Sequence, residues 1–240
     1  MFSIIIPTLN NLLYLKKCIE SIEKNSKYNH EIIPHVNIGN DGTIAYLESK
    51  DIVYTHTKEN SGICKGMNIA ANKSKHDYIL YAHDDFYFSP NWDEVLKKEV
   101  DKIGHNNFYL SGTMMHNGQI NFNCGETLEE FDENKFIENF NNYNYFDFQG
   151  STWAPHLIHR DLWNKVGGFS EEFFPGTGSD PDLNMKLWNE GVRIFKGIND
   201  FKVYHFGSIV TRKYKNHPTI KTESGSRGSK IFLLKWGISI

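Results

Sequence analysis

Hydrophobic positions along the chain form two kinds of pattern, short continuous runs and longer stretches with helical spacing. The continuous runs lie at residues 2–6, 31–38, 51–57 and 78–82, and the helical spacing covers residues 12–25 and 63–71. Continuous apolar runs predict buried strands, and a period near 3.6 predicts amphipathic helices. The order strand-helix-strand-strand-helix-strand predicts an α/β protein with a mostly parallel, twisted sheet that has helices on both faces.

The second half of the chain is less regular. A helix is predicted at 95–103, strands at 108–112, 152–158, 192–196 and 201–204, and further helices at 162–166 and 180–191, the last with Asp180 as its N-cap. Residues 114–149 have weak periodicity and many asparagines. They are predicted to be either an irregular segment that faces a substrate or an insertion that packs on the core. Residues 212–227 are basic and rich in serine and glycine, which predicts a flexible loop.

Length, charge and cysteine usage narrow the class of protein. The 240 residues are enough for one sizeable core, and the net charge of −3 argues against nucleic acid or an anionic membrane as the main partner. Three widely spaced cysteines fit free thiols in a reducing cytosol, so we expect a cytoplasmic protein. No apolar run reaches the ~20 residues that span a bilayer, and the N-terminal run lacks the features of a signal peptide. The pattern indicates neither membrane contact nor a particular oligomeric state.

The apolar run at 78–82 ends in His83, Asp84 and Asp85. Because side chains alternate along a strand, we expect His83 and Asp85 to point together and Asp84 to point away. Open α/β sheets bind ligands at the carboxyl ends of their strands. Adjacent carboxylates are stable only when they are solvated, hydrogen-bonded or bound to a cation. The trio is therefore either a cation site or a solvated turn.

Six further motifs accompany this trio along the chain. They are residues 2–10 with their Pro-Thr-Leu-Asn ending, Gly39-Asn40-Asp41-Gly42-Thr43, Asn60-Ser61-Gly62 with Asn68, Gly167-Gly168-Phe169-Ser170-Glu171, Ser179-Asp180-Pro181-Asp182-Leu183, and the late His205. In this order and spacing they resemble the inverting glycosyltransferases of family 2, a GT-A-fold group that uses nucleotide-sugar donors. The chain departs from the family pattern at Asn40, in place of an acid, and at Ser179, in place of glutamate.

The resemblance implies a metal-dependent glycosyltransferase that moves a sugar from a nucleoside-diphosphate donor to a glycan or other hydroxyl acceptor, with inversion. It implies one GT-A-like domain over residues 1–240, with a nucleotide-sugar and metal-binding half (1–112), an acceptor-binding and catalytic half (113–210) and a basic flexible tail (211–240). Two alternatives stay open: a nucleotidyltransferase of the same fold, and an inactive protein that binds a glycan or nucleotide. Residues 8–11 lack the glycine-rich basic loop of the first, and only Ser179 supports the second.

A divalent cation would balance the charge of the departing diphosphate, and hard cations prefer carboxylate oxygens. Asp85 is the best direct ligand, and an imidazole from His83 would favour Mn²⁺ over Mg²⁺. By resemblance, His205 completes the metal site, the alternative being a structural histidine. Asp84, on the other face, would accept a hydrogen bond from a ribose hydroxyl or a backbone amide.

The resemblance places the catalytic base at Asp180, with Asp182 as the competing candidate. The base has to accept the proton of the attacking acceptor hydroxyl. An aspartate before proline at a helix start is also an ordinary cap, and capping lowers a carboxylate pKa. We favour Asp180 and keep both.

The other predicted site residues surround the donor and the acceptor. They are Pro7, Thr8 and Asn10 for the nucleobase, Asp41 for the base or ribose, Asn60, Gly62 and Asn68 beside the diphosphate, Lys65 for a phosphate, Arg212 and Lys213 as a basic flap, and Trp153 for stacking on the acceptor sugar. Each has an ordinary alternative as a turn residue, a solvated cation or a core aromatic.

Overall fold

The computed structural model describes residues 1–149, 153–207 and 224–240. Its first half consists of β1 (Phe2–Leu9), α1 (Leu12–Asn25), β2 (Glu31–Asn37), α2 (Thr43–Ser49), β3 (Thr55–Thr57), α3 (Gly62–Ala71), β4 (Tyr78–Tyr81), β5 (Phe86–Phe88), α4 (Trp92–Ile103) and β6 (Phe108–Met115). The second half consists of α5 (Glu133–Asn139), η1 (Phe140–Asn142), β7 (Phe148–Gln149), β8 (His156–His159), α6 (Arg160–Val166), η2 (Glu171–Phe173), α7 (Ser179–Asn189), β9 (Ile194–His205) and α9 (Ser224–Trp236).

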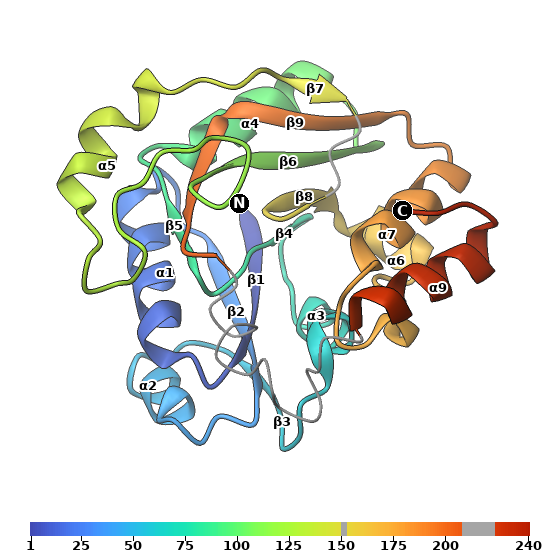
Figure 1. Cartoon of the computed structure of the whole chain (residues 1–240), viewed down its shortest axis with the longest axis horizontal. Helices are drawn as coiled ribbons and strands as arrows, with labels where there is room; N and C mark the ends of the chain where they lie inside the picture. Colours follow the sequence, from blue (N-terminus) through green and yellow to red (C-terminus); the bar gives the residue numbers. More distant parts are fainter. Residues whose placement is uncertain (150–152, 208–223) are drawn as a thin grey trace.

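One sheet runs through the described part of the chain, in the order β3-β2-β1-β4-β8-β6-β9-β5, with β7 paired to β9. Strands β1 to β4 are parallel to one another, and β9 is parallel to β6. Strand β8 runs antiparallel between β4 and β6, and β5 runs antiparallel to β9. Figure 1 shows α1 and α2 on one face of the sheet, and α3, α6 and α7 on the other.

The path of the chain through this sheet reverses at β1. The chain moves outward from β1 through β2 to β3 and then returns to β4 on the other side of β1. At such a reversal the loops after neighbouring strands diverge and leave a crevice, in which ligands of open α/β sheets bind. The carboxyl ends of β1 and β4 therefore mark the expected site.

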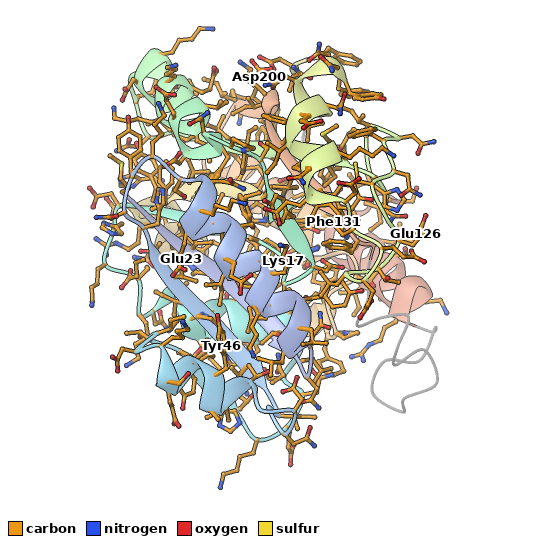
Figure 2. The ribbon with its side chains drawn as sticks, turned by 90° about the vertical axis from the view of Figure 1, so that its left-hand side faces the viewer. Lys17, Glu23, Tyr46, Glu126, Phe131 and Asp200 are labelled. Carbon is orange, nitrogen blue, oxygen red and sulfur yellow. The ribbon has the colours of Figure 1, made fainter. Side chains whose placement is uncertain are left out.

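Two clusters of buried side chains hold the domain together. The larger one lies on both faces of the sheet and includes residues of every major helix except α5. The smaller one joins the segment after β6 to β5 and β9 through Tyr87, Phe136 and Tyr204. Lys17 of α1, which is labelled in Figure 2, forms an ion pair with Glu133 of α5 that closes this side. The segment after β6 thus packs on the core, as one of its two predicted alternatives required.

Short elements account for most differences from the predicted order. Helix α2 lies between the second and third strands, where no helix was expected, and it shortens the predicted strand 51–57 to β3. It starts because the Asp41 carboxylate accepts hydrogen bonds from the Thr43 amide and hydroxyl, at 3.2 and 2.6 Å. Helix α5 was missed as well. Its N-cap is Asp132, whose carboxylate accepts from the Lys135 amide, whereas the N-cap of α2 is Gly42.

Three further predictions are corrected towards the C-terminus. The two strands predicted at 192–196 and 201–204 form one continuous strand, β9, whose pairing with β6 shifts register between Ser111 and Thr113. The predicted loop 212–227 gives way to α9 from Ser224 onward, and Phe232 of α9 is buried in the larger cluster. Helix α7 begins at Ser179 after Gly178, which adopts φ +89°, so the predicted N-cap at Asp180 is wrong.

A buried histidine joins β2, β3 and the start of α3. His35 lies in β2, its Nδ1 is 2.8 Å from Thr55 Oγ1, and its Nε2 is 3.3 Å from Ser61 Oγ. Gly66 of α3 packs so closely that a Cβ there would come within 2.5 Å of the imidazole. Burial, with a smaller contribution from His56, lowers the pKa of His35 from 6.5 to about 4.

This lowered pKa predicts a pH-dependent stability. Above pH 6.5 His35 is neutral in both the folded and the unfolded chain; between pH 6.5 and 4 only the unfolded chain takes up the proton, so the folded state is destabilised as the pH falls. The expected loss reaches about 3 kcal/mol near pH 4. Urea unfolding of wild type and His35→Asn at pH 7, 5.5 and 4.5 measures it. The variant should lose less stability with falling pH; an equal loss in both proteins would contradict the assignment.

Candidate functional site

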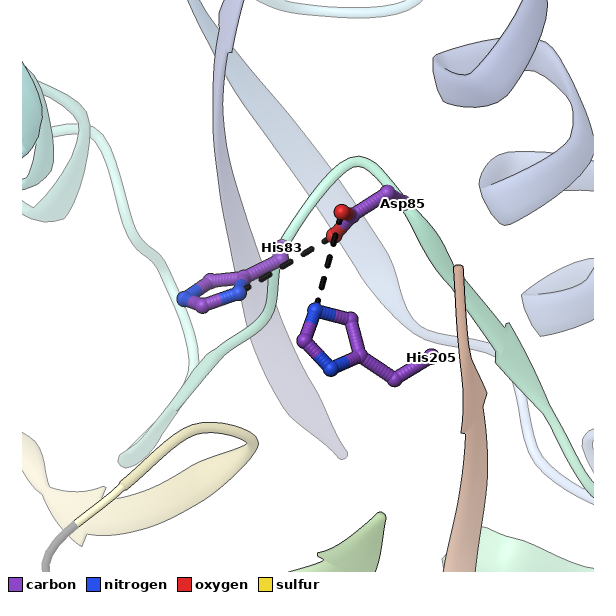
Figure 3. A group of neighbouring side chains, drawn as sticks. All are labelled: His83, Asp85 and His205. Atoms are coloured by element: carbon purple, nitrogen blue, oxygen red, sulfur yellow. Dashed lines mark ion pairs between the residues drawn. The ribbon is translucent and has the colours of Figure 1, made fainter. Parts of the chain in front are cut away.

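Three predicted metal ligands meet at the carboxyl edge of the sheet. Ligand atoms of His83, Asp85 and His205 all lie within 4.8 Å of one another (Figure 3). His83 Nδ1 is 4.0 Å from Asp85 Oδ1, and His205 Nε2 is 3.6 Å from Asp85 Oδ2. Asp85 and His205 are buried, whereas the His83 side chain is 35% exposed.

These three residues lie together for a different reason from the one predicted. Strand β4 ends at Tyr81, so His83 and Asp85 lie in a turn and strand alternation does not orient them. The chain instead reverses into β5, where Phe86 pairs directly with His205 of β9. This antiparallel pair places the end of β9 against the turn, and the predicted split of the trio still holds.

The donor chemistry of the three residues fits a divalent cation. His205 Nδ1 is 3.0 Å from the carbonyl oxygen of Asn117, which fixes the proton on Nδ1 and the lone pair on Nε2, toward Asp85. Burial lowers the pKa of His83 from 6.5, so its imidazole is neutral at physiological pH, as metal binding requires. Two imidazoles and one carboxylate form a ligand set that suits Mn²⁺ better than an all-oxygen site would.

Asp84 faces away from this cluster and toward β1. Its Oδ2 accepts a 2.6 Å hydrogen bond from the Thr8 hydroxyl, and the side chain is buried. Burial, and then the neighbouring charge of Asp85, raise the pKa of Asp84 to about 7. At neutral pH the two carboxylates of this buried turn therefore do not both carry a full negative charge.

Asp180 and Asp182 lie on different sides of α7. The Asp180 side chain is 36% exposed, whereas Asp182 is wholly buried. The Asp182 carboxylate accepts hydrogen bonds from Ser170 Oγ at 2.6 Å and Trp236 Nε1 at 2.9 Å, and it pairs with Lys235 at 2.9 Å. Asp182 therefore ties α9 to α7, and Asp180 is the carboxylate of the two that stays partly exposed.

Aromatic rings connect Asp180 to the metal cluster. The ring of Tyr81 lies 5.2 Å from the ring of His83 and 4.8 Å from that of His156, and His156 Nε2 lies 3.8 Å from Asp180 Oδ1. His156 was not among the predicted site residues, because it lies inside an apolar run that was predicted as a strand. The only sequence signal for His156 is that a polar residue lies two positions before the end of the predicted strand 152–158.

The residues predicted for the nucleobase and ribose lie at the ends of β1 and β2. Pro7 and Thr8 are buried in β1, and the Asn10 side-chain oxygen accepts from the amides of Gly39 and Asn40 at 3.0 and 3.1 Å. Asp41 accepts from the Leu12 amide at 2.9 Å as well as from Thr43. Burial acts to raise the pKa of Asp41, but these hydrogen bonds outweigh it and lower the pKa below 3.8.

The residues predicted for the diphosphate lie around the start of α3. Asn60 accepts from the amide of Gly62, which has φ +76° and packs against Phe174. The side-chain amide of Asn68 is hydrogen-bonded to the motif at residues 167–171. It donates to the Phe169 carbonyl and accepts from the Phe169 amide, both at 2.9 Å. Lys65 is exposed on α3.

Of the residues predicted for the acceptor and the flap, Trp153 is half-buried three residues before the start of β8. Arg212 and Lys213 lie outside the described residues. Ser179, which replaces the family's glutamate, is buried and its hydroxyl donates to the Gly176 carbonyl at 2.6 Å. This serine therefore holds the turn that leads into α7.

Comparison with known proteins agrees with this geometry. A family model described as "Glycosyl transferase family 2" matches residues 3–166, which is more than half of the chain. The chain belongs to glycosyl transferase family 2. An uncharacterized glycosyltransferase of Haemophilus influenzae is 25% identical over 109 residues, which cover 45% of this chain and 37% of that protein.

Solved structures show that the family 2 chain has the fold predicted from its motifs. The crystal structure of S. aureus TarS superposes with a TM-score of 0.65 at 16% identity, over 97% of this chain and 42% of TarS. The structure of TarS 1–349 in complex with UDP gives 0.64 at 15% identity, over 99% of this chain and 72% of that one. The family and the α/β GT-A class are thus confirmed. The chain spans about two fifths of the length of the Haemophilus influenzae relative and of the first TarS structure.

None of the helices in the described part of the chain has both the length and the apolar character that crossing a bilayer needs.

The contacts of Asp182 predict a stability effect that separates it from Asp180. Asp182→Asn removes the charge that pairs with Lys235 and is expected to destabilise the domain by about 2 kcal/mol. Asp180→Asn, the matched control in the same helix turn, should change stability by less than about 1 kcal/mol. Urea unfolding at pH 7.5 measures both. Equal effects, or a larger effect at Asp180, would contradict the proposed tie between α7 and α9.

Proposed function

We propose that this family 2 chain transfers a sugar from a nucleoside-diphosphate donor to an acceptor hydroxyl, with inversion at the anomeric carbon and with the help of a divalent cation. One observation supports this function above all others. The sheet edge at the β1–β4 crevice brings together a cluster of His83, Asp85 and His205 and, across the Tyr81 ring, an open carboxylate at Asp180. A leaving group that needs a cation and a nucleophile that needs a base require these two features side by side.

The donor is proposed to lie in the crevice between β1 and β4. Pro7, Thr8, Asn10 and Asp41 would contact the nucleobase and ribose; the diphosphate would extend past Asn60, Gly62 and Lys65, while Asn68 supports that loop through Phe169. Asp84, whose Oδ2 accepts from the Thr8 hydroxyl, is proposed to contact a ribose hydroxyl of the donor. UDP is the nucleotide to test first, because structures of TarS 1–349 with UDP and with UDP-GlcNAc have this fold.

His83, Asp85 and His205 would hold the cation, and Mn²⁺ is favoured over Mg²⁺ because two of the three ligands are imidazoles. When bound, the cation neutralises the negative charge that builds up on the departing diphosphate. The tautomer of His205 is fixed by the Asn117 carbonyl, so this ligand is oriented in advance.

Asp180 is the proposed general base. The acceptor oxygen attacks the anomeric carbon from the side opposite the diphosphate; its proton passes to the Asp180 carboxylate as the bond between the anomeric carbon and the phosphate oxygen breaks. Asp182 is less suited to this role, because its oxygens already accept from Ser170 and Trp236. Trp153, half-buried beside β8, is proposed to stack on the acceptor sugar.

The cation assignment predicts a difference between the two adjacent acids. Asp85→Ala should abolish Mn²⁺-dependent binding of UDP, lowering affinity at least about tenfold, because a direct ligand is lost. Asp84→Ala should leave Mn²⁺ affinity within about threefold, because this side chain faces Thr8. Titration calorimetry of UDP with and without Mn²⁺ measures both, with the remote, exposed Asp161→Ala as control. A larger loss of Mn²⁺ affinity in the Asp84 variant would reverse the assignment.

The base assignment predicts a loss of rate without a loss of binding. Asp180→Asn should lower turnover of the preferred nucleotide sugar about 10²- to 10⁴-fold, because the carboxylate no longer accepts the proton. The Mn²⁺-dependent UDP affinity should stay within about twofold. Release of nucleoside diphosphate from a donor panel measures turnover. Wild type that binds UDP but turns over no donor would favour a binding protein instead, and an unimpaired variant would exclude Asp180.

A further inference from the structure

A histidine lies behind Asp180 in the wall of the crevice. His156 is the first residue of β8, and its side chain is completely buried. The rings of Tyr81 and Tyr109 lie 4.8 Å from its ring on two sides, and the Phe169 ring lies 6.0 Å away. Such an enclosure leaves the imidazole few orientations, so it forms a fixed part of the wall.

The polar atoms of this pair are not satisfied within the described protein. His156 Nε2 and Asp180 Oδ1 are 3.8 Å apart, too far for a hydrogen bond, and neither they nor His156 Nδ1 has another partner among the described residues. Buried polar atoms almost always have partners, so a buried ring nitrogen aimed at a carboxylate oxygen calls for an explanation. The Asp180 side chain is the one that can move, since it is partly exposed near the start of α7.

We propose that His156 is the positioning residue for Asp180. In the substrate-bound enzyme the Nε2–H of His156 donates to Asp180 Oδ1, which holds Oδ2 toward the acceptor hydroxyl. This inference rests on the proposed function, because it assigns a support to the proposed base. Catalytic hydrogen bonds that are long in the free enzyme commonly shorten when the substrate is bound.

The surroundings of His156 suit a neutral donor. Burial lowers the pKa of His156 from 6.5, and this effect outweighs the opposing attraction of Asp180. A neutral imidazole orients a carboxylate through one N–H without neutralising the charge of that carboxylate. The next histidine along the strand, His159, has a different role: its Nδ1 accepts from the Asp161 amide at the start of α6. It therefore provides a matched control at the other end of β8.

Steady-state kinetics form the first arm of the test, with the nucleotide sugar that the wild type turns over fastest. His156→Leu should lower kcat about 10- to 100-fold and leave the donor KM and the Mn²⁺-dependent UDP affinity within about twofold. His156→Gln, which keeps an N–H near the position of Nε2, should recover part of the loss, and His159→Gln should match wild type. In an Asp180→Asn background, His156→Leu should cause less than a twofold further loss. The proposal would be overturned if the losses of kcat caused by His156→Leu and Asp180→Asn multiply in the double variant. Equal losses of kcat in His156→Gln and His156→Leu would also overturn it.

Nitrogen NMR of the imidazoles in the intact chain forms the second arm and needs no turnover. The His156→Gln spectrum identifies the His156 signals. In wild type at pH 7.5, with UDP and Mg²⁺, the proton should reside on Nε2, and Asp180→Asn should shift both ring nitrogens. Signals that are identical in wild type and Asp180→Asn would overturn the positioning role. If no donor is turned over, the proposed function fails, while this second arm still decides whether the pair exists.

Discussion

Two adjacent carboxylates buried at the end of β4 are the constraint around which this domain is arranged. Asp84 and Asp85 are both nearly inaccessible, although burying charge of one sign is strongly unfavourable without compensation. The structure separates them: Asp84 turns to the hydroxyl of Thr8 on β1, and Asp85 turns to His83 and His205. Each carboxylate thus requires a different neighbouring strand to be in place, so the site forms only when β1, β4, β5 and β9 are assembled.

The sequence motifs predicted which residues meet, but the stated reason for the split of the trio was incorrect. Alternation along a strand was expected to pair His83 with Asp85, yet β4 ends before both residues. The pairing comes from the antiparallel contact of Phe86 with His205, a long-range contact that no local pattern encodes. The periodic elements α1 and α3 were predicted from their apolar faces. The seven-residue helices α2 and α5 were not, because each depends on an aspartate that binds the amides of its first turn rather than on periodicity.

The choice between Asp180 and Asp182 shows how much a spacing can decide. Residues two apart on an α-helix point about 200° apart, so only one of the two carboxylates can face the crevice. The spacing therefore excludes a shared role but does not say which residue faces the crevice. That depends on Lys235 and Trp236, more than fifty residues further along, which bind Asp182 and leave Asp180 partly exposed. His156 could not be predicted from the sequence either, because its importance depends on a long-range contact with Asp180 that exists only in the folded chain.

The two halves of the site also have to be kept apart electrostatically. A general base loses its usefulness if its charge is neutralised, and a cation site loses affinity if a second carboxylate draws the ion away. Here Tyr81 lies between His83 and His156, and its pKa is raised well above 10, chiefly by burial, so it places no charge between them. Asp85 stands with the two imidazoles, and Asp180 faces a third. Burial lowers the pKa of His83 and of His156, so these two rings face Asp85 and Asp180 without adding a positive charge there. The proposed roles of the two carboxylates, one for the leaving group and one for the nucleophile, require such a separation.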